Sequence, residues 1–76
     1  MLINTTDGIQ VAAYDVLQIS IDEGQWMDYA TIRDKQDASF AIVKCRAGSV
    51  LQMDGRVFRF RIIRQHMGTT VVYERN

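Results

Sequence analysis

The sequence predicts an α+β fold, in which a single antiparallel sheet of four to five strands carries one helix packed on one face. Two observations lead to this prediction. Several segments alternate apolar and polar residues, as half-buried strands do, and the clearest of them is residues 58–62. Residues 35–46 instead repeat apolar positions with a helical period, and they separate two groups of strand-like segments. The expected order of elements is therefore β-β-α-β-β-β, because an amphipathic helix must bury its apolar stripe against a sheet.

Two strands are expected before the helix. Residues 1–8 end in a Thr-Thr-Asp-Gly cluster that indicates a turn, and residues 9–14 fit a strand or a helical turn equally well. Residues 16–21 alternate, and residues 26–32 are rich in aromatic and β-branched side chains, so both segments predict strands. The polar residues 22–25 predict the turn between these two strands.

The helix is expected over residues 35–46, and both of its ends carry signals. Asp34 can cap the N-terminus by accepting a hydrogen bond from a backbone N–H, and Asp37 imitates the second half of a capping box. Lys44 lies in the last turn, where a cation is favoured, and Gly48 is a natural stop.

The predicted helix has two apolar sides. The side expected to face the sheet consists of Ala38, Ala41, Ile42 and Cys45. Most of these side chains are small, which lets a helix lie close to a sheet. Phe40, Val43 and Ala47 fall on nearly the opposite side, so they are expected to face outward. One sheet cannot cover both sides.

Three strands are expected after the helix. Residues 49–53 and 56–65 flank Asp54-Gly55, which is a strong hairpin signal because a type I′ turn needs positive φ at both central positions. A turn at residues 66–68 then leads to a last strand at residues 69–74.

The long strand has two chemically different faces. Phe58, Phe60 and Ile62 share the face expected to be buried, because side chains on a strand point to opposite faces in turn. Arg59 and Arg61 share the other face. The strand therefore needs a core on one side and presents cations on the other.

Composition favours one domain over residues 1–76 and excludes several classes of protein. No apolar run approaches the roughly 20 residues needed to span a membrane, and residues 1–20 lack the pattern of a secretory signal. Cys45 is the one cysteine, so neither an internal disulfide nor a cysteine-based zinc site can form. We therefore expect a cytoplasmic protein without a metal or cofactor.

Catalysis is not expected. Cys45 and His66 are the one nucleophile–base pair of the Cys–His kind, and a catalytic centre also needs an orienting group that converges on them. The carboxylates fall at turns and at the helix start, where capping explains them. The glycines are isolated, so no phosphate-binding loop is present. No residue is predicted to be catalytic.

An arginine-bearing sheet face is one candidate site, for nucleic acid. Its cations are Arg56, Arg59, Arg61 and Arg64. They could contact phosphates while Trp26 or Tyr29 stacks on a base. The alternative is that they pair across strands with Asp15, Asp22 or Asp28. Acidic residues concentrate in the first half of the chain and basic ones in the second, yet the net charge is zero, which argues against strong non-specific binding.

A protein-binding surface is the other candidate. Trp26, Tyr29 and Phe40 belong to the residue types enriched in binding hot spots, although each could instead fill the core. The predicted outward side of the helix, with Phe40, Val43 and Ala47, needs cover. The N-terminal residues 1–3, a second copy of the chain in a homodimer, or a foreign protein could supply it.

Three segments together resemble small ββαββ-type accessory proteins of bacteriophages and prophages. They are Trp-Met-Asp-Tyr-Ala-Thr at residues 26–31, the capped helix from Asp34, and Asp-Gly-Arg-Val-Phe-Arg-Phe-Arg-Ile-Ile-Arg at residues 54–64. The resemblance covers about residues 15–74 and implies a bacterial host cytoplasm and a non-enzymatic role. Some of these proteins are inhibitors of host machinery, including anti-CRISPR and other counter-defence factors.

The expected function is therefore that of a small protein-binding domain, a phage-derived modulator or inhibitor of a host protein. The alternative is a nucleic-acid-binding or transcription-regulating module that uses the arginine-bearing face.

Overall fold

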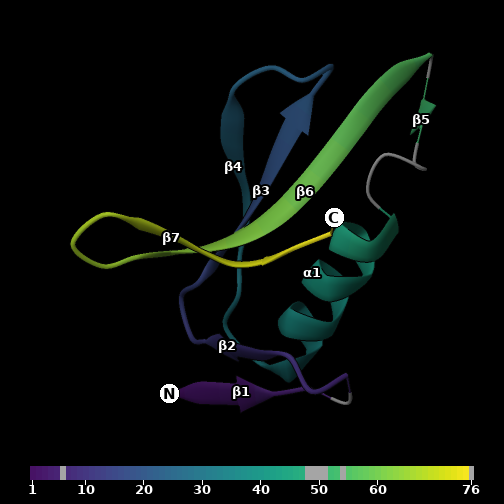
Figure 1. The fold of residues 1–76 in the computed structure, drawn as a ribbon. Helices are drawn as coiled ribbons and strands as arrows, with labels where there is room; N and C mark the ends of the chain where they lie inside the picture. The colour runs from purple at the N-terminus through teal and green to yellow at the C-terminus, as the bar shows by residue number, and fades with distance from the viewer. Residues whose placement is uncertain (6, 48–51, 54, 76) are drawn as a thin grey trace.

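The computed structural model describes residues 1–5, 7–47, 52–53 and 55–75, and it shows an α+β fold with two antiparallel sheets (Figure 1). The elements in chain order are β1 (Leu2–Asn4), β2 (Gln10–Ala12), β3 (Val16–Ile21), β4 (Trp26–Thr31), α1 (Lys35–Ala47), β5 (Gln52–Met53), β6 (Arg56–Gln65) and β7 (Thr69–Glu74).

The larger sheet is built around β6, the long strand expected from the sequence. Its order is β4-β3-β6, and β5 and β7 pair with the two ends of β6. The register sets Phe60 opposite Ile19 and Ile62 opposite Leu17, so these four side chains share the inner face of the sheet. The predicted burial of Phe60 and Ile62 is confirmed, and Phe58 packs against the same core while partly buried.

The hairpin predicted at Asp54-Gly55 is supported by the pairing of Met53 with Arg56 and by Gly55, whose φ is 74°. Positive φ at the second turn position is what a type I′ turn requires. Asp54 itself lies outside the described residues, as do Gly48, the predicted helix stop, and residues 49–51 of the predicted short strand.

The helix α1 lies across the inner face, beside β6 and β7 (Figure 1). The N–H of Asp37 donates to Asp34 Oδ1 over 2.8 Å, which confirms Asp34 as the helix cap. The carboxylate of Asp37 reaches back, as predicted, and its Oδ2 accepts a hydrogen bond over 2.9 Å. The donor of this second bond is the N–H of Arg33 rather than that of Asp34. At the other end Arg75 donates to the carbonyl oxygen of Arg46 over 2.6 Å. Within the described residues, no helix is long and apolar enough to cross a membrane.

The prediction about the two sides of the helix is confirmed except at Ala47. The buried helix residues are Ala38, Ala41, Ile42 and Cys45. Phe40 and Val43 are exposed, and Ala47 is partly buried in the last turn. The small side therefore faces the sheet, because only small side chains let the helix axis approach β6 closely.

The expectation of a single sheet is wrong. The segments before Asp15 form a separate hairpin of β1 and β2, which lies across one end of the core (Figure 1). The chain leaves this small sheet at Tyr14, whose φ is 74°, and then enters β3. Asp15 holds the junction, because its Oδ2 accepts the N–H of Ala12 over 2.7 Å and its carbonyl accepts the N–H of Ile32 over 2.8 Å. Over the described residues, the observed order is thus four strands, one helix and three strands.

One core joins the two sheets and the helix. Ile3 and Val11 of the small sheet are both buried in it, opposite each other in the register. Cys45 from the helix is fully buried in the same cluster. The small sheet therefore covers one end of the core, and Ile3 is the residue of β1 that is buried there.

Candidate functional site

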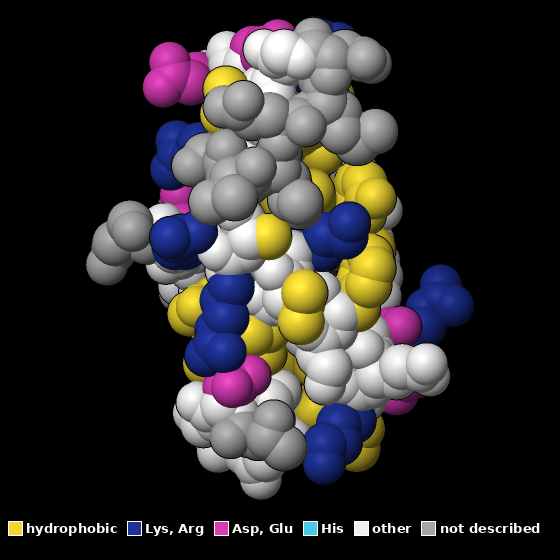
Figure 2. Space-filling model, turned by 90° about the vertical axis from the view of Figure 1, so that its right-hand side faces the viewer, with side chains coloured by type: hydrophobic (Ala, Val, Ile, Leu, Met, Phe, Trp, Pro, Cys, Tyr) yellow, Lys and Arg dark blue, Asp and Glu magenta, His cyan; other side chains and the backbone are white. Residues whose placement is uncertain are grey.

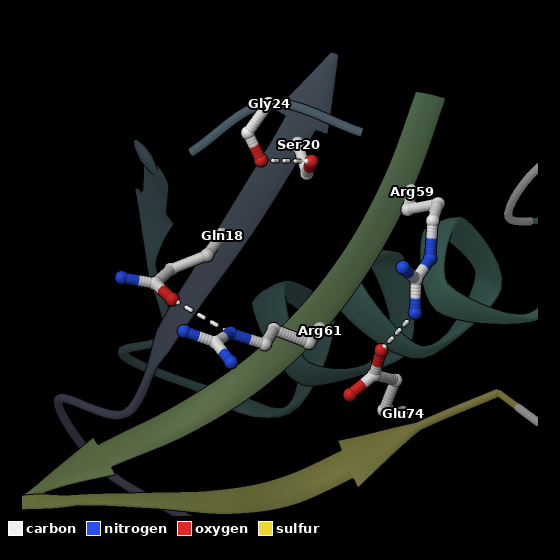
Figure 3. Close-up of polar contacts among 6 residues, drawn as sticks. All are labelled: Gln18, Ser20, Gly24, Arg59, Arg61 and Glu74. Atoms are coloured by element: carbon white, nitrogen blue, oxygen red, sulfur yellow. Dashed lines mark hydrogen bonds and ion pairs between the residues drawn. The ribbon is translucent and has the colours of Figure 1, made fainter. Parts of the chain in front are cut away.

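The outer face of the larger sheet carries polar contacts among side chains of four strands, β3, β4, β6 and β7, and Figure 3 shows those of Arg59 and Arg61. Arg61 donates through Nε to Gln18 Oε1 over 2.9 Å, and Gln18 donates through Nε2 to Asp28 Oδ1 over 2.9 Å. Arg59 donates to Glu74 Oε2 over 2.6 Å. We call Gln18, Trp26, Asp28, Arg59, Arg61 and Glu74 the arginine face.

Trp26 is the aromatic of this face. The guanidinium carbons of Arg61 and Arg59 lie 4.3 Å and 5.5 Å from the centre of its ring, which is the range of cation–π contact. Gln18 and Ser20 lie beneath these long side chains, which explains why two polar residues of the outer face are buried. Ser20 satisfies its hydroxyl by donating to the carbonyl oxygen of Gly24 over 2.7 Å.

The other two predicted arginines lie at the ends of β6 and pair with carboxylates. Arg56 Nε is 2.9 Å from Asp22 Oδ2, and Arg64 donates two hydrogen bonds to the buried Asp15, over 2.9 Å and 3.0 Å. The N–H of Val57 and then the guanidinium of Arg56 lower the pKa of Asp22, because both donate to its ionised form. For Arg56 and Arg64 the structure therefore shows the alternative to phosphate binding, which is pairing across strands with Asp22 and Asp15.

A second surface combines the helix with the inner side of β4. Phe40 and Val43 are 47% and 65% exposed, and Met27 and Tyr29 are each 49% exposed. Hydrophobic side chains appear at the surface on the helix side of the molecule, beside Lys and Arg side chains (Figure 2). With Lys44 added, we call these five residues the apolar surface.

Contacts between rings and Lys44 connect the two halves of the apolar surface. The Nζ of Lys44 lies 5.3 Å from the ring centre of Phe40 and 5.8 Å from that of Phe60. Tyr29 meets Phe60 edge to face, with ring centres 5.5 Å apart. Phe60 is buried, so it forms the floor between Phe40 on α1 and Tyr29 on β4.

The structure does not bring all the predicted protein-binding residues together. Tyr29, Phe40 and Val43 belong to the apolar surface, whereas Trp26 lies on the outer face of the sheet with Arg61. The physical reason is the strand period, because an odd separation along β4 places Trp26 and Tyr29 on opposite faces. Of the three possible covers for the outward side of the helix, the N-terminal residues do not supply one, since Leu2 is 61% exposed and Phe40 is 47% exposed.

Met27 and Lys44 were not among the predicted binding residues. A signal for both was present in the sequence, since Met27 shares a strand face with Tyr29 by the period of two. Lys44 follows Phe40 by four positions, which is the spacing at which helix side chains meet.

The structure does not bring Cys45 and His66 together. Cys45 is buried on the helix, and desolvation, followed by the charge of Glu74, raises the pKa of its thiol to about 12. His66 is exposed at the tip of the β6–β7 hairpin, which projects away from α1 (Figure 1). Among the described residues, no group of three or more His, Cys, Asp or Glu could hold a metal ion.

Comparison of the chain with protein-family models, with curated proteins and with solved structures finds no match.

Proposed function

We propose that this chain is a protein-binding domain and that the apolar surface is its contact site. The observation that carries the proposal is the exposure of four apolar side chains on α1 and β4, namely Phe40, Val43, Met27 and Tyr29. The buried ring of Phe60 contacts Tyr29, and Lys44 links it to Phe40. Exposed apolar side chains that cluster on so small a domain are typical of a surface that another protein covers. Phe and Tyr also supply large contact area at little cost in side-chain entropy, which suits a binding hot spot.

The resemblance to phage and prophage accessory proteins supports a more specific role. It rests on residues 26–31, on the helix and on residues 54–64. Two of these segments contribute to the apolar surface, because Met27 and Tyr29 lie on β4 and Phe40 lies on α1. On this basis the proposed partner is a bacterial protein whose activity the domain modulates.

The test compares three variants, Phe40→Asp, Val43→Asp and Met67→Asp. Met67 is 98% exposed in the turn between β6 and β7, so its variant introduces the same charge at an exposed apolar side chain away from the apolar surface. Each protein is used to capture partners from a bacterial lysate, and the captured proteins are compared by mass spectrometry. Thermal unfolding followed by circular dichroism checks that each variant is folded.

We expect a partner that the wild-type protein and Met67→Asp capture and that Phe40→Asp and Val43→Asp lose, with all four proteins folded. A charge in the middle of an apolar contact must be desolvated without a partner, which is why binding should fall. Capture that is equal in all four proteins would contradict the proposal.

A second candidate function is nucleic-acid binding by the arginine face. The observation that favours it is the position of Trp26, whose ring contacts the guanidinium groups of Arg59 and Arg61. Sheet-based RNA-binding domains combine an aromatic platform with cations in this way. The engagement of Arg59 by Glu74 reduces the charge available to phosphates.

Gel shifts with single-stranded RNA and DNA at low salt test this second candidate. If it holds, Arg59→Ala and Arg61→Ala weaken binding together, and affinity falls with salt by roughly one log–log unit per phosphate contact. A protein that shifts neither nucleic acid at low salt does not bind by this face.

A further inference from the structure

We infer that the segment bound by the apolar surface is acidic, with an Asp or Glu that pairs with Lys44 and apolar side chains on either side of it. This inference rests on the proposed function, and it adds the chemistry of the partner. It follows from the position of Lys44, from the contacts of the other charged side chains, and from the apolar side chains around it.

The surroundings of Lys44 differ from those of the arginines that form ion pairs. Four described arginines have a carboxylate oxygen at 3.0 Å or less, namely Arg46, Arg56, Arg59 and Arg64. Within the part of the chain that the structure describes, Lys44 pairs with no carboxylate, and its contacts are the rings of Phe40 and Phe60. Its ammonium group has three donors, and aromatic faces satisfy the charge without accepting ordinary hydrogen bonds.

The position of Lys44 makes it suited to a carboxylate from outside. The side chain is partly buried, so it is already held in place by α1 and by the two rings. An ammonium group that is ordered before binding loses less entropy when it forms an ion pair. Phe40 lies against Lys44, and Tyr29 lies against the other ring that Lys44 contacts, Phe60. A partner that covers Phe40 and Tyr29 excludes water from the ion pair, which strengthens the attraction.

Among the described residues, nearly all the carboxylates of a second copy of this chain are already engaged. Ion pairs engage Asp7, Asp15, Asp22 and Glu74. Asp34 and Asp37 cap the helix, and Asp28 accepts from Gln18. Of the described carboxylates this leaves Glu23, in the β3–β4 turn. A two-fold axis through the apolar surface would also bring Lys44 towards the Lys44 of the second copy, and two like charges repel.

A peptide selection tests the inference with the full chain. A displayed library of random 12-residue peptides is selected separately on the wild-type protein and on Lys44→Glu. Lys35→Glu serves as the matched control, since Lys35 is an exposed lysine at the opposite end of α1. Phe40→Asp reports whether a selected peptide uses the apolar surface, and light scattering measures the oligomeric state of every protein.

We expect the wild-type selection to enrich peptides with an Asp or Glu between apolar residues. Lys44→Glu should weaken these peptides about tenfold or more, because a desolvated charge pair becomes a repulsion, while Lys35→Glu binds them unchanged. Selection on Lys44→Glu should enrich Lys or Arg at the same peptide position. A change of the selected peptide residue from acidic to basic cannot result from a loss of folding.

Two outcomes would overturn the inference and leave the proposed function standing. The first is a set of peptides that need Phe40 but carry no acidic residue and bind Lys44→Glu unchanged. The second is a wild-type dimer that becomes a monomer in Phe40→Asp, which would place a second copy on this surface. Peptides that bind Phe40→Asp as well as the wild-type protein would instead contradict both proposals.

Discussion

Replacement of Arg64 by Met tests whether an arginine predicted to bind phosphates instead holds the fold together. The carboxylate of Asp15 accepts two hydrogen bonds from Arg64, over 2.9 Å and 3.0 Å, and one from the N–H of Ala12 over 2.7 Å. Met keeps an unbranched apolar side chain in place of the arginine stem but removes the charge and both hydrogen bonds. Asp15 would then keep its charge at the junction between β2 and β3, with one donor left.

The free energy of unfolding that Arg64→Met is expected to lose lies between two limits. The Asp15 side chain is 2% exposed, and breaking a buried pair on one side costs about 3–5 kcal/mol. The Arg64 side chain is 40% exposed, and exposed pairs contribute about 0–1 kcal/mol. We therefore expect Arg64→Met to lower the free energy of unfolding by about 2–4 kcal/mol. With a urea dependence of about 1 kcal/mol per molar, the unfolding midpoint falls by about 2 M or more.

Urea unfolding followed by circular dichroism measures this change. Arg59→Met is the control, because the side chains of Arg59 and Glu74 are 45% and 26% exposed, so we expect a loss of about 0–1 kcal/mol. A double-mutant cycle with Asp15→Asn isolates the pair, and the double variant should lose less than the sum of the single losses. The structural role of Arg64 is refuted if Arg64→Met is no less stable than Arg59→Met.

Two further predictions concern the core. Phe60→Ala should lower the free energy of unfolding by about 3–5 kcal/mol, because it removes a buried ring that supports Tyr29 and Lys44, and a loss under about 0.5 kcal/mol would contradict its place in the core. Burial raises the pKa of the Cys45 thiol from 9.0 to about 12. Between these two pH values the thiol ionises in the unfolded chain but stays neutral in the folded one, so the free energy of unfolding should fall as the pH rises from 9 towards 12. The thiol should therefore resist alkylation at pH 8 until urea unfolds the chain, and rapid alkylation of the folded protein would count against this burial.

The elements that the sequence predicted well are those specified by short-range signals. The strands at residues 56–65 and 69–74 agree with the structure, and the helix differs from the prediction by one residue at its end. Their signals are the period of two in a strand, the cap at Asp34 and the turn at residues 66–68, all of which act between residues close in sequence. The outward position of Phe40 also followed from helix geometry alone.

The small sheet was missed for the opposite reason. Strands β1 and β2 have three residues each, which is too short to show a clear period. Their identity depends on pairing with each other and on the burial of Ile3 and Val11 beneath the helix, and neither is visible locally. The turn at Tyr14 then separates them from the larger sheet.

By itself, the sequence determined the helix, its buried and exposed sides, and the alternation of aromatic and arginine residues along β6. Only the tertiary structure shows which charged side chains form ion pairs within the chain. Arg64 meets Asp15 from 49 positions away and Arg56 meets Asp22 from 34 positions away, while Lys44 lies against aromatic rings. Ion pairs of this kind depend on strand register and on the packing of α1, because Coulomb attraction acts through distance in space rather than along the chain.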